Sequence, residues 1–220
     1  MNANSALEHS DYENYLVFLY FGAGPYDLSK CINRAYLDFS RTLHGLGRLA
    51  PEKKEKLVKQ VISELEQCFS NLCDSADTMD EKGFDDWHRA TYQQLLTIYN
   101  NYGYNMPKRH FFVGQAQKWI NMTFKYIFTL AALNEKQLLG FGKVYPFCHA
   151  PIDTVLIARL GSRKYGIRWP HRCAWSRLDD YDEYLAYQKR IRQKFRLVPL
   201  DVEFKLWLEE DIDTTDMTLV

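Results

Sequence analysis

The chain lacks both a net charge and a long apolar run. Its 28 Lys and Arg residues balance its 28 Asp and Glu residues, so no overall field draws it to nucleic acid or to an anionic membrane. Any site for a polyanion must therefore be local. Gly22 and Gly24 interrupt the apolar stretch near the start, and Lys118, Asn121 and Lys125 interrupt the one in the middle. No window reaches the roughly 18 apolar residues of a membrane span, and we expect no contact with a membrane.

Signals for secretion, disulfides and cofactors are also missing. The five cysteines are odd in number and form no Cys-x-x-Cys pair, and residues 1–9 lack the basic and then apolar segment of a signal peptide. We therefore expect a reducing, cytoplasmic location. Cys148 and His149 are adjacent, but no second cluster supplies further metal ligands, and no Walker A sequence is present. We expect neither a metal nor a cofactor.

The residues that are abundant predict a folded, mainly α protein. With 220 residues, 46% apolar and 15% aromatic, the chain is long enough to bury a core, and we expect a single compact helical domain. Apolar spacing and turn signals predict helices at residues 12–20, 28–43, 51–69, 85–99, 115–133, 154–160, 176–195 and 199–208. The helix over 115–133 is the most apolar and should be central, and a short extended piece is expected near residues 143–147.

Two helix starts carry the candidate chemistry. Gly114 precedes a helix that carries Lys118 about one turn in, and Pro151-Ile152-Asp153 opens a later helix with Asp153 as its N-cap. A lysine acts as a nucleophile only when neutral, and a carboxylate is needed where positive charge develops. We expect the two helix ends to meet at one concave site.

This pattern resembles the helix-hairpin-helix DNA glycosylase superfamily. The gap between Lys118 and Asp153 is similar to that of the archaeal 8-oxoguanine DNA glycosylases and their bacterial relatives. The resemblance covers residues 111–160 and implies a helix-hairpin-helix-like catalytic core there, between N-terminal helices at 1–110 and basic C-terminal helices with an acidic tail at 161–220. It implies that Lys118 attacks C1′ of a damaged nucleotide and that Asp153 stabilises the cationic sugar.

The same resemblance implies DNA as the partner and a modified base as the substrate. The base would be a purine such as 8-oxoguanine or a modified base of phage DNA, in repair or in antiviral defence, and abasic lyase activity is expected as well. Backbone N–H groups at Val113, Gly114 and Gln115 would bind phosphate. No cysteine cluster for an iron–sulfur centre follows, so that branch of the superfamily is excluded. Protein partners cannot be inferred.

Local charge also favours a nucleic-acid partner. Residues 159–196 hold eleven Lys and Arg against four Asp and Glu, interleaved with aromatic residues, and the tail is acidic. Basic residues mixed with aromatics suit a phosphate backbone and an extruded base. The predicted DNA contacts are Arg159, Arg163, Lys164, Arg168 and Arg172, and the predicted base-pocket residues are His149, Trp169 and Trp175.

Two alternative interpretations stay open. Lys118 belongs to a polar stripe with Gln115, Asn121 and Lys125 that is compatible with a solvent-facing surface, and Asp153 is compatible with a cap alone. The protein would then be a non-catalytic helical module that binds nucleic acid or another protein. Alternatively, Arg41-x-x-His44 resembles the Arg/His pair of helical ribonucleases of toxin and defence systems.

Overall fold

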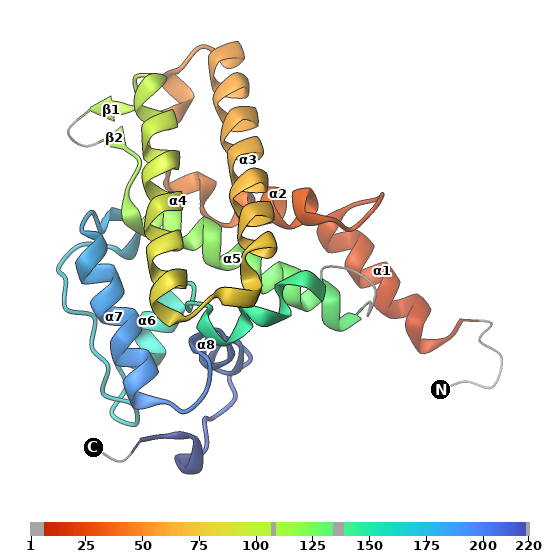
Figure 1. Cartoon of the computed structure of the whole chain (residues 1–220), viewed down its shortest axis with the longest axis vertical. Helices are drawn as coiled ribbons and strands as arrows, with labels where there is room; N and C mark the ends of the chain where they lie inside the picture. The colour runs from red at the N-terminus through yellow and green to blue at the C-terminus, as the bar shows by residue number, and fades with distance from the viewer. Residues whose placement is uncertain (1–6, 107–108, 134–138, 219–220) are drawn as a thin grey trace.

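A computed structural model describes residues 7–106, 109–133 and 139–218, and most of these residues form α-helices (Figure 1). The α-helices are α1 (His9–Phe21), α2 (Leu28–Phe39), α3 (Pro51–Asp74), α4 (Glu81–Asn101), α5 (Val113–Leu133), α6 (Thr154–Leu160), α7 (Tyr181–Lys194) and α8 (Pro199–Trp207). The predicted fold class is confirmed. No helix in these described ranges is both long and apolar enough to cross a membrane.

Helix α5 is the centre of the fold. Most of its residues are buried, and α2 packs along it. Trp119 of α5 donates from its indole N–H to the carbonyl of Ile32 in α2 at 3.0 Å. In Figure 1, α3 and α4 stand side by side on one side of α5, whereas α6, α7 and α8 lie on the other. The expectation of a central buried helix is confirmed.

Local signals set most of the helix starts. Asp27, Asp80 and Asp153 each accept a backbone hydrogen bond as N-caps, and Pro51 and Pro199 occupy first helical positions. An N-cap carboxylate accepts a hydrogen bond from an otherwise unpaired N–H group of the first helical turn, and a proline at that turn has no N–H group to pair. They explain why the sequence predicts the helices well in these places.

Several boundaries differ from the prediction. The second helix stops at Phe39, and short 3₁₀ turns follow at Ser40–Thr42 and Leu46–Arg48. The N-cap of α7 is Asp180, whose side chain accepts from two backbone N–H groups, so the helix begins later than expected. The piece expected to be extended at 143–147 lies within 3₁₀ turns, Leu139–Lys143 and Tyr145–Phe147.

The predicted helix-hairpin-helix element is not confirmed. The connection between α4 and α5 contains a short antiparallel ladder, β1 (Asn105–Met106) with β2 (Arg109–His110). Val113 and Gly114 belong to the first turn of α5 rather than to a glycine hairpin. The remaining 3₁₀ turns are Ala76–Thr78, Trp175–Arg177 and Thr214–Asp216.

Candidate functional site

Helices α5 and α6 bring Lys118 and Asp153 into direct contact. Lys118 Nζ donates to Asp153 Oδ2 at 2.7 Å, and the two side chains are only 6% and 11% exposed. Asp153 Oδ1 accepts from the N–H of Leu156 at 2.9 Å. One carboxylate therefore caps α6 and holds the lysine at the same time. The expectation that both side chains face one site is confirmed.

Amide side chains hold the backbone on which Asp153 lies. Gln117 accepts from the N–H of Ile152 at 3.0 Å and donates to its carbonyl at 2.8 Å. Gln188 of α7 accepts from the N–H of Ala150 at 3.1 Å and donates to its carbonyl at 2.7 Å. Gln117 and Ile152 each precede one member of the Lys118–Asp153 pair. Their hydrogen bonds therefore align the two chain segments and fix the ion pair.

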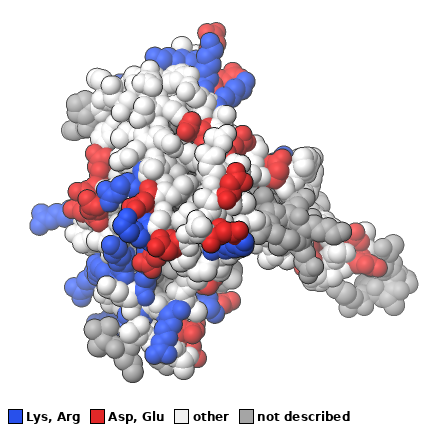
Figure 2. All heavy atoms as spheres, viewed as in Figure 1, with Lys and Arg blue, Asp and Glu red and all other residues white. Residues whose placement is uncertain are grey.

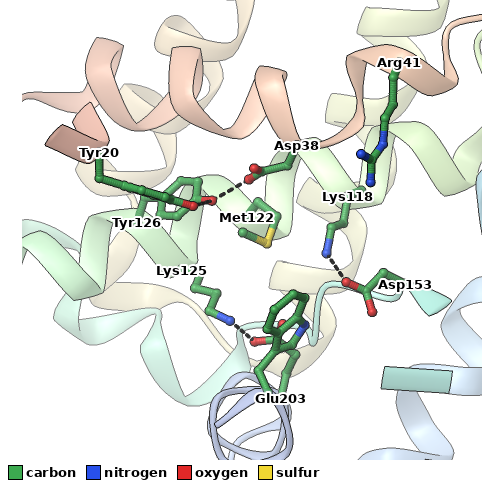
Figure 3. Close-up of a pocket in the computed structure, with 10 residues that line it drawn as sticks. Tyr20, Asp38, Arg41, Lys118, Met122, Lys125, Tyr126, Asp153 and Glu203 are labelled. Carbon is green, nitrogen blue, oxygen red and sulfur yellow. Dashed lines mark hydrogen bonds and ion pairs between the residues drawn. The ribbon is translucent and has the colours of Figure 1, made fainter. Parts of the chain in front are cut away.

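Lys118 and Asp153 line a cavity of about 250 Å³. Its walls come from α1, α2, α5, α8 and the turns beside them, and Figure 3 shows its polar pairs. The lining residues are Tyr20, Asp38, Arg41, Lys118, Met122, Lys125, Tyr126, Asp153, Glu203 and Trp207. Three of these are basic and three acidic, so the cavity has no formal excess charge. Its volume lies below the roughly 300–1,000 Å³ of sites for drug-sized ligands, which suits a ligand no larger than one nucleobase.

Glu203 of α8 is the most unusual residue of the cavity. Its side chain is fully buried, and Oε2 accepts from Lys125 Nζ at 2.6 Å, whereas Oε1 has no hydrogen-bond partner. Burial raises the pKa of this carboxyl group and outweighs the opposing effect of Lys125. A buried acceptor without a partner costs about 1–3 kcal/mol. Because Oε1 itself is buried, an N–H group of a bound ligand would remove that cost only after the side chain turns towards the cavity.

Aromatic and apolar side chains supply the remaining walls. Tyr126 donates to Asp38, and its hydroxyl lies 2.9 Å from that of Tyr20. Trp207 and Met122 add a ring and a thioether. No motif in the sequence marks any of these residues or Glu203 as functional. Glu203 and Trp207 are four apart on one helix, which places them on one face, but only tertiary packing brings that face to α5.

The predicted phosphate-binding residues are buried, and the backbone N–H groups of Gly114 and Gln115 already donate to carbonyl groups of the protein. Val113, Gly114 and Gln115 are each almost fully buried, and the N–H of Gly114 donates to the carbonyl of Leu178 at 3.0 Å. A Cβ on Gly114 would lie 1.8 Å from the carbonyl oxygen of Trp175. The glycine therefore permits close backbone packing, and its N–H group is not presented to a phosphate.

His149 does not line the cavity. It belongs instead to a separate polar network in the core. Its Nε2 lies 2.8 Å from Asp85 Oδ1, and its Nδ1 lies 2.7 Å from the hydroxyl of Tyr184. Arg192 binds the same Asp85 carboxylate through two nitrogens, at 3.0 and 3.2 Å. Burial lowers the pKa of His149 to about 4. The neutral imidazole is therefore the form that the core holds at neutral pH.

Trp169 and Trp175 also lie away from the cavity lining. The indole N–H of Trp169 donates to the carbonyl of Cys173 at 3.1 Å, and its ring packs edge-on against Tyr187. Trp175 begins the 3₁₀ turn that packs against Gly114. Both tryptophans shape the segment before α7, and neither forms the walls described above.

The predicted basic contacts divide into two groups. Arg159 and Lys164 form ion pairs with Glu209 at 2.6 Å and Asp211 at 2.9 Å in the acidic C-terminal segment. The others, Arg163, Arg168 and Arg172, are exposed. Figure 2 shows Lys and Arg side chains gathered on the side of the molecule where α7 lies. A phosphate backbone would compete with the acidic segment for the first group but not for the second.

The ribonuclease-type pair is split between two environments. Arg41 lines the cavity, whereas His44 is exposed after the Ser40–Thr42 turn and does not contribute to the lining. Among the described residues, no group of three or more His, Cys, Asp or Glu side chains is placed to hold a metal ion.

Comparisons with protein-family models, with curated proteins and with solved structures found no match.

Proposed function

We propose that the protein is a DNA glycosylase that uses Lys118 as an amine nucleophile and Asp153 as its carboxylate partner. One observation carries this proposal: Lys118 Nζ lies 2.7 Å from Asp153 Oδ2 on the wall of a cavity of about 250 Å³. A buried lysine held by a helix-capping carboxylate is fixed in position, as a nucleophile must be.

The two side chains account for the proton and the electron pairs of the reaction. The Lys118 ammonium must lose a proton before attack, and Asp153 Oδ2 is its hydrogen-bonded acceptor. The amine nitrogen then forms a bond to C1′, while the bond from C1′ to the base breaks and its electron pair leaves with the base, which takes up the proton that Asp153 received. Asp153 is then a carboxylate again and stabilises the positive charge on the sugar and its bound nitrogen.

The cavity offers what an extruded base requires. A flipped base needs apolar or aromatic faces and a hydrogen-bonding edge, and it must leave the helical stack. Trp207 and Met122 supply the former, and Glu203 supplies an acceptor without a partner, Oε1, which rotation of its buried side chain would turn towards the base. A carboxylate acceptor favours a base with N–H donors, as modified purines have. The balanced charge of the cavity also suits a neutral base.

Affinity for the DNA backbone must come from outside the cavity. The exposed residues Arg163, Arg168 and Arg172 lie in the segment that leads from α6 towards α7. Phosphate contacts of this kind position the duplex and make binding sensitive to salt, whereas the cavity selects the base.

Covalent trapping tests the proposal. An amine nucleophile passes through an iminium adduct with the opened sugar, and borohydride reduces that adduct to a stable cross-link. We expect the wild-type protein to cross-link to oligonucleotides that carry a modified purine, and we expect Lys118→Gln to form no cross-link.

Two further lysines serve as controls. Lys125→Gln removes the other amine of the cavity and should slow the reaction but keep the cross-link, because this lysine is paired with Glu203. Lys189→Gln, an exposed position on α7, should behave as the wild type. A cross-link that depends on Lys125 instead would assign the nucleophile to that residue. Wild-type protein that neither cross-links nor releases a base from a broad panel of damaged and phage-type DNA would support the non-catalytic binding module.

A further inference from the structure

Helix α1 exposes large apolar side chains around most of its circumference. It projects from the body of the molecule in Figure 1, and Val17 is its one buried residue. The large hydrophobic residues of α1 that are about half exposed or more are Tyr12, Tyr15, Leu16, Phe18, Leu19 and Tyr20. A helix that is apolar all round is normally buried in a larger assembly.

The most exposed side chains of α1 form one stripe. Tyr12, Tyr15, Leu16 and Leu19 follow the spacing i, i+3, i+4 and i+7, which places them on a single helix face. That face lies opposite Val17, which contacts the body. The same spacing forms the seam between two helices in a coiled coil. The stripe therefore has the form of a helix-pairing surface.

The stripe alone covers part of a protein interface. An aromatic side chain can bury about 150–250 Å², so the four side chains of the stripe, each about half exposed or more, present on the order of 400 Å². A standard interface takes about 800 Å² from each partner, so the charged residues beside the stripe must supply the rest of the contact.

We propose that α1 pairs with α1 of a second copy of this chain, antiparallel and about a twofold axis near Leu16. The charges on either side of the stripe are complementary under that symmetry. Glu8, Asp11 and Glu13 lie at the start of α1, whereas Lys30 and Arg34 of α2 lie beside its end. Antiparallel pairing brings the acidic end of each α1 to the basic end of the other, as a self-complementary twofold interface requires.

Lys30 lies at the C-terminal end of α1, where the acidic start of the second α1 would be placed. Its ammonium donates to the carbonyl of Ala23 at 2.7 Å and lies 3.5 Å from that of Phe21. In a pair centred on Leu16, residue 21 of one helix lies opposite residue 11 of the other, so Asp11 faces Lys30. A lipid surface fits less well, because helices that lie on membranes carry a basic face and α1 carries acidic residues.

Pairing would also support the cavity. Tyr20 lies in the last turn of α1, and its hydroxyl contacts that of Tyr126 at the cavity wall. Since Val17 alone anchors α1 by burial, the second copy would hold this wall in place. The dimer does not depend on the proposed glycosylase reaction, because the stripe is a separate surface from the Lys118–Asp153 pair.

Light scattering after size exclusion tests the dimer on the full-length protein. We expect the wild type to have twice the chain mass of 26.0 kDa at micromolar concentration. Leu16→Glu with Leu19→Glu should give the monomer mass with an unchanged circular dichroism spectrum, since both residues are exposed. The matched control Leu208→Glu changes an equally exposed leucine at the end of α8 and should stay dimeric.

A cross-link locates the symmetry axis. In a background with Cys173→Ser, which removes the exposed native cysteine, Leu16→Cys should be joined to its copy by a short bismaleimide. Placing the cysteine at Leu37, an exposed leucine of α2, should give no such product. A wild type that stays monomeric at 100 µM, or that binds vesicles of anionic phospholipid as a monomer, would overturn the proposal.

Discussion

Two buried polar clusters flank α5, and they differ in how completely their atoms are paired. One contains Lys118 and Lys125 and borders the cavity, where Glu203 Oε1 has no partner. The other contains His88 and Asn121, which hydrogen-bond to each other at 3.1 Å inside the core. Lys118 and Asn121 are three residues apart, so one helix contributes to both clusters.

Complete hydrogen bonding distinguishes a structural polar core from a ligand site. Of the described buried side-chain atoms that have no hydrogen-bond partner, none belongs to the network of His88, His149, Asn121 and Tyr184. A fully paired network strengthens a unique packing arrangement. The cavity cluster instead combines unoccupied volume with an unpaired acceptor, and both features favour a ligand. Changes in the cavity should therefore lower activity, whereas changes in the network should lower stability.

The largest expected contrast is between Asp153→Asn and Tyr184→Phe. The first removes a negative charge beside the reacting sugar while keeping a side chain that caps α6, and we expect excision to slow about 100- to 1,000-fold, as for loss of one positioned electrostatic group. The second removes the hydroxyl that contacts His149 and Asn121 and should cost about 1–3 kcal/mol of unfolding free energy.

Single-turnover excision and urea unfolding, measured on both variants, separate the two roles. Tyr184→Phe should retain the wild-type rate under conditions where it is folded, because its hydroxyl does not line the cavity. An equal loss of rate in both variants would contradict the division between site and network. Asp153→Asn also leaves the Lys118 ammonium without its partner, so some loss of stability is expected there too.

The sequence predicted the parts of this arrangement that depend on local signals. Lys118 and Asp153 each belong to a helix start, and caps and apolar periodicity fix such positions within a few residues. Glu203 and Trp207 could not be selected in this way, because nothing in their own segment indicates that α8 packs against α5. The sequence places His149 in the predicted base pocket, but an imidazole suits both a ligand site and a core, and only its contact with Asp85 decides between them.

The second prediction concerns pH and applies to the network. Burial lowers the pKa of His149 to about 4 from its ordinary value of 6.5, and burial, together with His149, also lowers that of His88. The unfolded chain therefore binds more protons than the folded chain below pH 6.5. Stability is fully present above that pH and is lost as the pH falls towards 4, by about 3 kcal/mol for His149 at about 1.4 kcal/mol per pH unit.

Protonation of Asp85 causes a further loss of stability at lower pH. Burial raises its pKa, but hydrogen bonds from His149 and Arg192 outweigh burial and lower it to about 2 from 3.8. Its contribution is therefore lost only below about pH 3.8. Urea unfolding at several pH values between 7 and 4.5 covers the range of the histidines, in which the buried Glu203 carboxyl group also titrates. The variant His149→Gln separates the two contributions, and it should flatten the slope. A stability that does not change over this interval would show that the network does not bury neutral imidazoles.

The smallest expected effect compares two tryptophans. Trp207 lines the cavity and is 46% exposed, whereas Trp169 packs against Tyr187 outside it. Stacking of a base on an aromatic ring contributes about 1–3 kcal/mol, so Trp207→Leu should weaken binding of a modified oligonucleotide by about 5- to 150-fold. Trp169→Leu should lower the melting temperature and leave binding nearly unchanged. Fluorescence anisotropy in the Lys118→Gln background measures binding without turnover. If Trp169→Leu weakened binding as much as Trp207→Leu, the base would have to bind outside the cavity, and the contrast between a paired network and an unpaired site would lose its functional meaning.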